Sequence, residues 1–170
     1  MAKLESAAIK LRPDDLEISA LIEEIAADCC DQVGKHCIRI CKEGKGLTVS
    51  GDRPLLAITI TELIVNAAKY ASLESPITIS VLEQSSQVVV SVHNEGSVID
   101  ASEQQRIFER FYRSPATKHG APGSGIGLSV AKRTAEAHHG SLWVKSNEAT
   151  GTTFFLSLPV IGRDCESVAR

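Results

Sequence analysis

The sequence lacks the features that mark several functional classes. No long apolar run interrupts its 170 residues, and the N-terminus carries charges at Lys3, Glu5 and Lys10, so we expect neither a signal peptide nor a membrane span. A net charge of -3 argues against a general affinity for nucleic acid or acidic membrane surfaces. We therefore expect a cytoplasmic segment that contacts neither nucleic acid nor membrane, and any anion site must be local.

The cysteines also exclude a class of site. The chain has five, an odd number without a CxxC pair, and no cysteine and histidine spacing resembles a zinc site. We expect reduced thiols at Cys29, Cys30, Cys37, Cys41 and Cys165.

Hydrophobic residues make up 43% of the chain, which is typical of one globular domain, and there is no internal repeat. Helical spacing runs from Ile18 to Cys29 and over residues 53–71 and 127–139. Period-two patterns predict strands within residues 35–43, 46–51, 75–84, 86–94, 140–147 and 151–159, the last four as two hairpins. The order predicts an α/β (α+β) two-layer sandwich, in which a mixed, mainly antiparallel sheet of about five or more strands has three helices on one face.

The helix expected over residues 53–71 has two distinct faces. Its core stripe is Leu56, Ile60, Leu63, Ile64, Ala67 and Ala71. Beside this stripe lie Glu62, Asn66, Lys69 and Tyr70, which are either a solvated face or a binding face. Asn66 favours binding, because asparagine is a weak helix former and its mid-helix position excludes a capping role.

A long irregular segment, residues 95–123, exceeds an ordinary connection and predicts either function or disorder. It begins at Asn94, Glu95 and Gly96, which alone could be a plain turn. Apolar and basic residues then interleave, so the run is either a small amphipathic helix on the core or a phosphate clamp. These residues are Ile107, Phe108 and Phe111 with Arg106, Arg110 and Arg113.

Glycines precede the last expected helix. Gly123, Gly125 and Gly127, with Ser124, lie where unpaired helix amides attract anions and where a missing Cβ lets those amides touch phosphate oxygens. Two familiar phosphate motifs do not fit: GxxxxGK[ST] lacks its last residues, and Leu128 replaces the third glycine of GxGxxG.

Five segments in order resemble the N, G1, F, G2 and G3 boxes of the ATPase domain of bacterial sensor histidine kinases. They are "ELIVNAAKYA", "VHNEGSVID", "RIFERFYRS", "GSGIGL" and "GTTFFLSLP", and the resemblance covers about Leu16 to Pro159. It implies a Bergerat-type fold that binds ATP under a mobile lid. It also implies a kinase domain at residues 14–160, between the end of a dimerisation helix or linker at residues 1–13 and a tail at residues 161–170.

The resemblance assigns roles to individual residues. Asn66 would coordinate Mg²⁺, Lys69 would approach the phosphates and Tyr70 would lie beside adenine. Asn94 would accept from the adenine amino group, Gly96 would let the backbone pass close to the base, and Thr152 would help to hold it. The residues of the G2 box would surround the triphosphate: Gly123, Ser124, Gly125, Ile126, Gly127 and Leu128. Residues 112–122 would form the lid, with Arg113 and Lys118 as its cations.

Glu62 has two interpretations: it polarises a nucleophile or orients Mg²⁺-bound water, or it pairs with Lys69 or Arg53. Two residues depart from the family pattern. Asn94 replaces an aspartate, so Asn94→Asp is predicted to tighten ATP binding up to about tenfold. Val98 replaces a second glycine.

None of the five histidines fits the family's phosphoacceptor motif, and His138 and His139 are expected to end a helix. The implied function is transfer of the γ-phosphoryl of Mg-ATP to a histidine on a dimerisation domain, with a response regulator downstream. The alternatives are a serine kinase of the anti-sigma type and a degenerate nucleotide-binding or interaction module.

Overall fold

The computed structural model describes residues 9–43, 46–115 and 124–161. These ranges contain three α-helices: α1 (Ile18–Asp28), α2 (Arg53–Tyr70) and α3 (Gly127–Ala137). Their strands are β1 (Asp14–Glu17), β2 (Ile38–Lys42), β3 (Thr48–Gly51), β4 (Ile77–Gln84), β5 (Gln87–Asn94), β6 (Ser141–Asn147) and β7 (Gly151–Pro159). One short 3₁₀-helix, η1, covers Arg106–Phe108.

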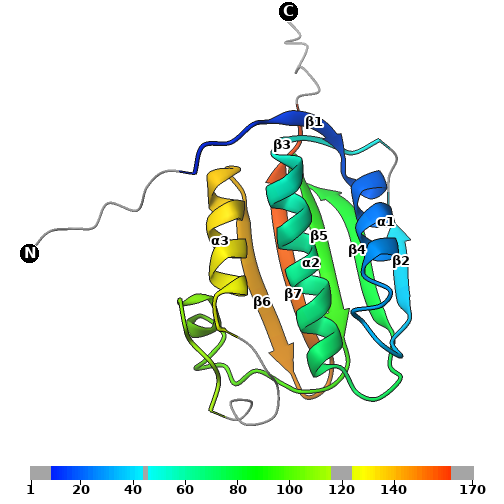
Figure 1. Cartoon of the computed structure of the whole chain (residues 1–170), viewed down its shortest axis with the longest axis vertical. Helices are drawn as coiled ribbons and strands as arrows, with labels where there is room; N and C mark the ends of the chain where they lie inside the picture. Colours follow the sequence, from blue (N-terminus) through cyan, green and yellow to red (C-terminus); the bar gives the residue numbers. More distant parts are fainter. Residues whose placement is uncertain (1–8, 44–45, 116–123, 162–170) are drawn as a thin grey trace, which may run out of the picture.

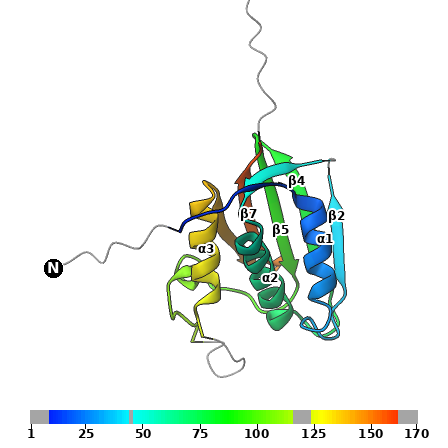
Figure 2. The ribbon, with the colours of Figure 1, turned by 45° about the horizontal axis from the view of Figure 1, so that its top comes forward.

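The main sheet has five strands in the order β2-β4-β5-β7-β6. β2 pairs in parallel with β4, and the other neighbours pair antiparallel. All three α-helices pack on one face of this sheet, which makes two layers (Figures 1 and 2). The expected two-layer sandwich with a mixed, mainly antiparallel sheet is confirmed, as are both hairpins. None of the helices in the described ranges is long and apolar enough to cross a membrane.

The core fills the space between the layers because both kinds of element present one apolar side. In β5, Val88, Val90 and Val92 are fully buried at alternate positions, and the same alternation continues to Asn94. On α2, the expected stripe from Leu56 to Ala67 is fully buried, whereas Ala71 follows the helix and is only half-buried. The period-two row therefore brings a polar side chain, Asn94, to the helix-facing side of the sheet.

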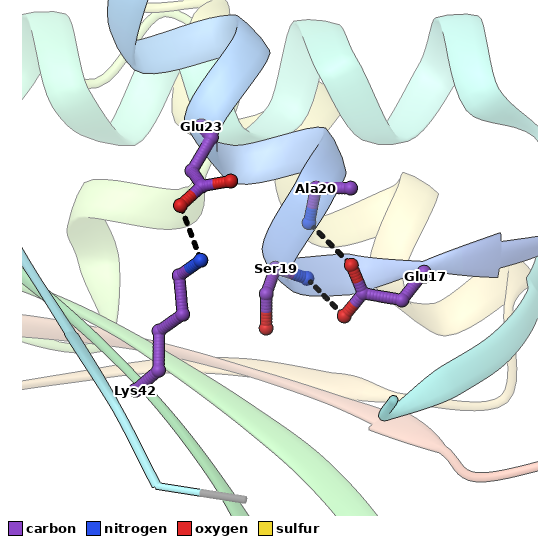
Figure 3. Close-up of polar contacts among 5 residues, drawn as sticks. All are labelled: Glu17, Ser19, Ala20, Glu23 and Lys42. Atoms are coloured by element: carbon purple, nitrogen blue, oxygen red, sulfur yellow. Dashed lines mark hydrogen bonds and ion pairs between the residues drawn. The ribbon is translucent and has the colours of Figure 1, made fainter. Parts of the chain in front are cut away.

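Side chains outside the core hold α1 in place (Figure 3). The Glu17 carboxylate accepts hydrogen bonds from the N–H groups of Ser19 and Ala20, which satisfies donors of the first turn. Lys42 on β2 forms an ion pair with Glu23 on α1. Through these contacts the helix is tied both to β1 and to the edge of the main sheet.

Two expectations were wrong in part. The strand at residues 46–51 does not join the main sheet: β3 pairs with β1, which the sequence analysis did not predict. The run from Arg106 to Ser114 is no amphipathic helix either, since only Arg106–Phe108 is helical, as a 3₁₀ turn. Phe108 packs on the core, but Phe111 has a positive φ of 64° and is 67% exposed. A hydrogen bond from Phe111 N–H to Gly125 O, at 2.8 Å, holds this conformation.

Candidate functional site

A cavity of about 310 Å³ opens where the C-terminal end of α2, the end of β5, the beginning of β7 and the beginning of α3 meet. In Figure 1 these ends lie together at the lower edge of the molecule. Described residues from Ser97 to Ser114, together with Ser124 and Gly125, form the remaining wall. Most of the site residues expected from the sequence line this cavity: Glu62, Asn66, Lys69, Tyr70, Asn94, Arg113, Ser124, Gly125, Gly127, Leu128 and Thr152.

The polar face of α2 is a wall of the cavity and not a solvated surface. Glu62, Asn66, Lys69 and Tyr70 are all half-buried. The Asn66 side-chain N–H donates to Glu62 O at 2.8 Å, so its Oδ1 is the atom left to contact a ligand. The orientation of this amide is therefore set by the helix itself.

The carboxylate of Glu62 lies against the beginning of α3. A Cβ added to Gly127 would stand 2.1 Å from Glu62 Oε2, closer than any real contact allows. α3 has no acidic residue in its first turn and no side-chain cap, so a carboxylate here interacts favourably with the helix dipole. Arg53, one of the two partners considered for Glu62, instead forms an ion pair with Glu24.

Asn94 lines the cavity, and only 1% of it is exposed. Neither its Oδ1 nor its Nδ2 has a hydrogen-bond partner among the residues that the structure describes. Buried polar side chains are normally hydrogen-bonded, and leaving one unpaired costs about 1–3 kcal/mol. Two unpaired atoms on one buried side chain beside a cavity indicate a ligand with complementary polar groups.

Thr152 is the register partner of Asn94 across β5 and β7. Its hydroxyl donates to Ser97 O at 3.1 Å and lies 2.6 Å from Ser146 Oγ. Ser146 Oγ in turn accepts from Ile99 N–H at 2.9 Å. This chain of hydroxyl groups fixes the segment that leaves β5, so Thr152 both lines the cavity and positions its wall.

Gly96 lies beside the end of α2, and its expected approach to the base stays a prediction. It is not among the cavity-lining residues. It packs against the end of α2, where an added Cβ would stand 2.3 Å from Tyr70 O, and its φ is 141°. Hydrogen bonds from Ser97 N–H to Tyr70 O and from Ser72 N–H to Glu95 O flank it. The glycine thus allows two backbone segments to pack closely at the edge of the site.

The segment from Glu103 to Ser114 forms a polar wall, in which the role of Glu103 was not predicted from the sequence. Glu103 accepts hydrogen bonds from the hydroxyl groups of Tyr112, at 2.6 Å, and Ser114, at 2.8 Å. The hydrogen bond to Glu103 raises the pKa of the Tyr112 phenol. Arg106 stacks 4.6 Å from the centre of the Tyr112 ring. These contacts show that this part of the long segment is built into the site.

Other cavity-lining residues were also missed: Val65, Ser97, Ile99, Ile107 and Phe154. Val65 lies one helical turn from Glu62 and Lys69, so the helical period alone could have found it. The others depend on contacts between distant segments. Ile126 is the residue before α3, and its carbonyl accepts from Ser129 Oγ, but it is not cavity-lining. Gly123 and Lys118 lie outside the described residues.

The site combines a helix N-terminus flanked by glycine, two cations (Lys69 and Arg113), and an acceptor oxygen on Asn66. It also contains the buried Asn94 amide, which has no hydrogen-bond partner in the described part of the chain. In a two-layer sandwich, this combination defines a site for a nucleoside phosphate. A family model described as "Histidine kinase-, DNA gyrase B-, and HSP90-like ATPase" matches residues 51–161. The chain belongs to this ATPase family.

Curated relatives indicate which kind of ATPase domain this chain resembles. The chain is 30% identical over 169 residues to the sensor-like histidine kinase SenX3 of Mycobacterium bovis, covering 95% of this chain and 40% of that protein. It is 34% identical over 162 residues to the adaptive-response sensory kinase SasA of Gloeothece citriformis, covering 94% and 41%. The chain thus spans less than half the length of these relatives, and it is an ATP-binding catalytic domain of the histidine kinase type.

Solved structures agree on the fold. The mycobacterial sensor histidine kinase MprB matches with a TM-score of 0.77 at 21% identity, over 88% of this chain and 98% of that one. The catalytic domain of histidine kinase ThkA matches with a TM-score of 0.75 at 24% identity, over 88% and 96%. At these low sequence identities, the structural matches support only the shared architecture. The roles of individual residues are argued from the geometry of the cavity.

Proposed function

We propose that this domain binds Mg-ATP in the cavity between α2 and α3 and transfers the γ-phosphoryl group to a histidine on a dimerisation domain. In this reaction the bond between the γ-phosphorus and its bridging oxygen breaks, a phosphorus–nitrogen bond to the imidazole forms, and ADP leaves. The observation that carries the proposal is the meeting of Asn66 on α2 with the glycine-flanked beginning of α3 in one cavity. A response regulator is the expected next acceptor, and the cytoplasm is the expected location.

The phosphate end of the site is assigned to α3 and the two cations. The amides of the first turn of α3, which have no side-chain cap, are natural anion donors, and Gly127 adds no side chain beside them. Lys69 and Arg113 line the same cavity from α2 and from the segment after η1. Phosphoryl transfer needs little covalent work from the protein, so such positioning and charge neutralisation are the main contributions.

The magnesium assignment rests on Asn66. Mg²⁺ prefers oxygen ligands, and the hydrogen bond from Asn66 Nδ2 to Glu62 O leaves the Oδ1 oxygen for the metal. This donor set fits the ion. When bound, Mg²⁺ neutralises the phosphate charge that develops during transfer. Lys118, Gly123 and most of the expected lid lie outside the described residues, so their roles stay predictions.

Glu62 keeps a proposed role in orienting the attacking imidazole or a water molecule at the metal. Its carboxylate is half-buried and lies beside Gly127, where the phosphate end of the site begins. A carboxylate in this position accepts a proton or hydrogen bond from a group that approaches the γ-phosphate. Glu62→Gln should therefore reduce transfer more than it reduces ATP binding.

The two alternatives are less well supported. The relatives named above are sensor kinases, which does not favour a serine kinase of the anti-sigma type. A degenerate module without catalysis would bind nucleotide but transfer nothing. Acid-stable label on a small antagonist protein would identify the first alternative, and binding without transfer would identify the second.

Calorimetry with Mg-ATP on the purified chain tests the proposal first. We expect binding that Asn66→Ala weakens at least about tenfold, which corresponds to about 1.4 kcal/mol. Asn147→Ala is the matched control, because Asn147 is exposed and caps a turn outside the cavity. Absence of Mg-ATP binding at millimolar concentration would overturn the proposal, and so would unchanged affinity in Asn66→Ala.

Transfer is tested by adding a dimerisation domain of a related sensor kinase and γ-labelled ATP. The proposal expects label that is labile to acid and stable to base, as a phosphorus–nitrogen bond requires. It also expects the label to disappear with Asn66→Ala and to persist with Asn147→Ala. Binding without any transfer to several such acceptors would reject the kinase activity while leaving the nucleotide site.

A further inference from the structure

The two asparagines of the cavity are held differently. Asn66 has one amide orientation, because its Nδ2 donates to Glu62 O. Asn94 is 1% exposed, and both atoms of its amide lack a partner among the residues that the structure describes. Its register partner Thr152 does not hold it, since the Thr152 hydroxyl donates to Ser97 O. No hydrogen bond within the described chain therefore fixes one orientation of the Asn94 amide over the other.

An amide and a carboxylate at this position have different chemistry. An ionised carboxylate offers only acceptors, whereas an asparagine amide offers one acceptor oxygen beside one donor nitrogen. A carboxylate thus accepts from a 6-amino group and opposes a 6-oxo group, which is itself an acceptor. An amide has a partner for either group.

The edges of the purines match the two orientations of the amide. A 6-aminopurine presents an amino donor beside the N1 acceptor, and a 6-oxopurine presents an oxygen acceptor beside an N1–H donor. One orientation of the Asn94 amide complements the first edge. A half-turn about the terminal bond of the side chain complements the second with the same number of hydrogen bonds.

We infer that Asn94 makes this site tolerant at the 6-position of the purine, so that it accepts inosine triphosphate as well as ATP. This inference rests on the proposed nucleotide site and specifies its substrate class. The phosphate end, built from α3 and Asn66, is the same for all purine nucleotides. Discrimination between them therefore depends on the buried amide.

Calorimetry of the intact chain with Mg²⁺ and ATP, ITP or inorganic tripolyphosphate tests the inference. ITP is the decisive probe, because it has the 6-oxo group without the 2-amino group of guanine. We expect the wild-type chain to bind ITP within about tenfold of ATP and well above tripolyphosphate, since both bases pair with the amide. In Asn94→Asp we expect tighter ATP binding and an ITP affinity at least about thirtyfold below that of ATP.

Asn66→Ala is the matched control, because it should weaken ATP and ITP by the same factor through the phosphate end. A wild-type preference for ATP over ITP above about a hundredfold would overturn the inference. The proposed function would still stand in that case, because ATP would still bind. ITP binding no tighter than tripolyphosphate would also overturn it. Absence of binding by ATP itself would overturn both. The wild-type comparison remains decisive even if Asn94→Asp does not fold.

Discussion

Glu62 Oε2 lies where a side chain on Gly127 would be: the added Cβ would be only 2.1 Å from that oxygen. The Glu62 side chain, from the middle of α2, therefore lies against the first residue of α3, where the phosphates are proposed to bind. This arrangement places a carboxylate and unpaired helix amides in the same small volume. Replacing the glycine therefore tests how the two helices share the site.

Gly127→Ala should weaken Mg-ATP binding by about tenfold or more, because the methyl group displaces Glu62 and covers the first-turn amides. Stability should change little, by less than about 1 kcal/mol, since a glutamate end can move and alanine favours the helix over glycine. Calorimetry and urea unfolding measure the two effects. Val130→Ala, on the exposed side of the same helix, is the control and should leave affinity unchanged. An unaltered ATP affinity in Gly127→Ala would contradict the assignment of the phosphates to α3.

Gly96→Ala should destabilise the domain by at least about 3 kcal/mol. The new Cβ would stand 2.3 Å from Tyr70 O, and its neighbours are backbone atoms that cannot rotate away. Gly34→Ala is a matched control, because Gly34 also has a positive φ, 63°, but has open space around it. That variant should lose only about 1 kcal/mol, the cost of the left-handed backbone. Equal losses in urea unfolding would show that close packing at Gly96 is not the cause.

His138 should be a structural residue, so that its substitution lowers the free energy of unfolding. Its Nε2 accepts from Asp52 N–H at 2.9 Å and its Nδ1 lies 2.7 Å from Thr134 O, which requires the proton on Nδ1. His138→Ala leaves the Asp52 N–H unpaired and opens a cavity, so unfolding free energy should fall by about 2–4 kcal/mol. His139→Ala, at the exposed neighbour, should stay within about 0.5 kcal/mol of the wild type. A similar effect of both substitutions on chemical denaturation would refute this role.

Asp52 should make the domain sensitive to acid. A hydrogen bond from the Arg12 N–H is the main cause that lowers the pKa of this carboxyl, and a hydrogen bond from the Leu55 N–H adds to it. Because the pKa is lower in the folded chain, the stabilisation is full above the unfolded value of about 3.9 and is lost as pH falls through the folded value. Asp52 is the N-cap of α2, where its side chain accepts from Leu55 N–H. Asn also caps helices, so Asp52→Asn keeps this cap while removing the titration.

Urea unfolding between pH 3 and pH 6 tests this expectation. The wild type should be more stable than Asp52→Asn at pH 6, and the difference should shrink below about pH 4. A constant difference across this range would mean that the Asp52 carboxylate does not contribute through its charge.

Local patterns predicted most of the fold because the helical and period-two repeats are written in neighbouring residues. The core stripe of α2 and the two hairpins are such cases. β1 was missed because Leu16 is its only buried residue, so its pairing with β3 has no periodic signal. Phe111 was placed on a helix because its spacing is helical, yet its bond to Gly125 overrides that preference.

For the site, the sequence alone determined the polar face of α2 and the glycines before α3. Both are local features, because the residues of the polar face lie on neighbouring turns of one helix and the glycines lie in one short run. Only the tertiary structure decided that Glu62 meets Gly127, that Glu103 binds Tyr112 and Ser114, and that the Asn94 amide is buried without a hydrogen-bond partner among the described residues. These facts depend on how separate elements pack. Burial and hydrogen bonding between segments distant in sequence leave no local pattern.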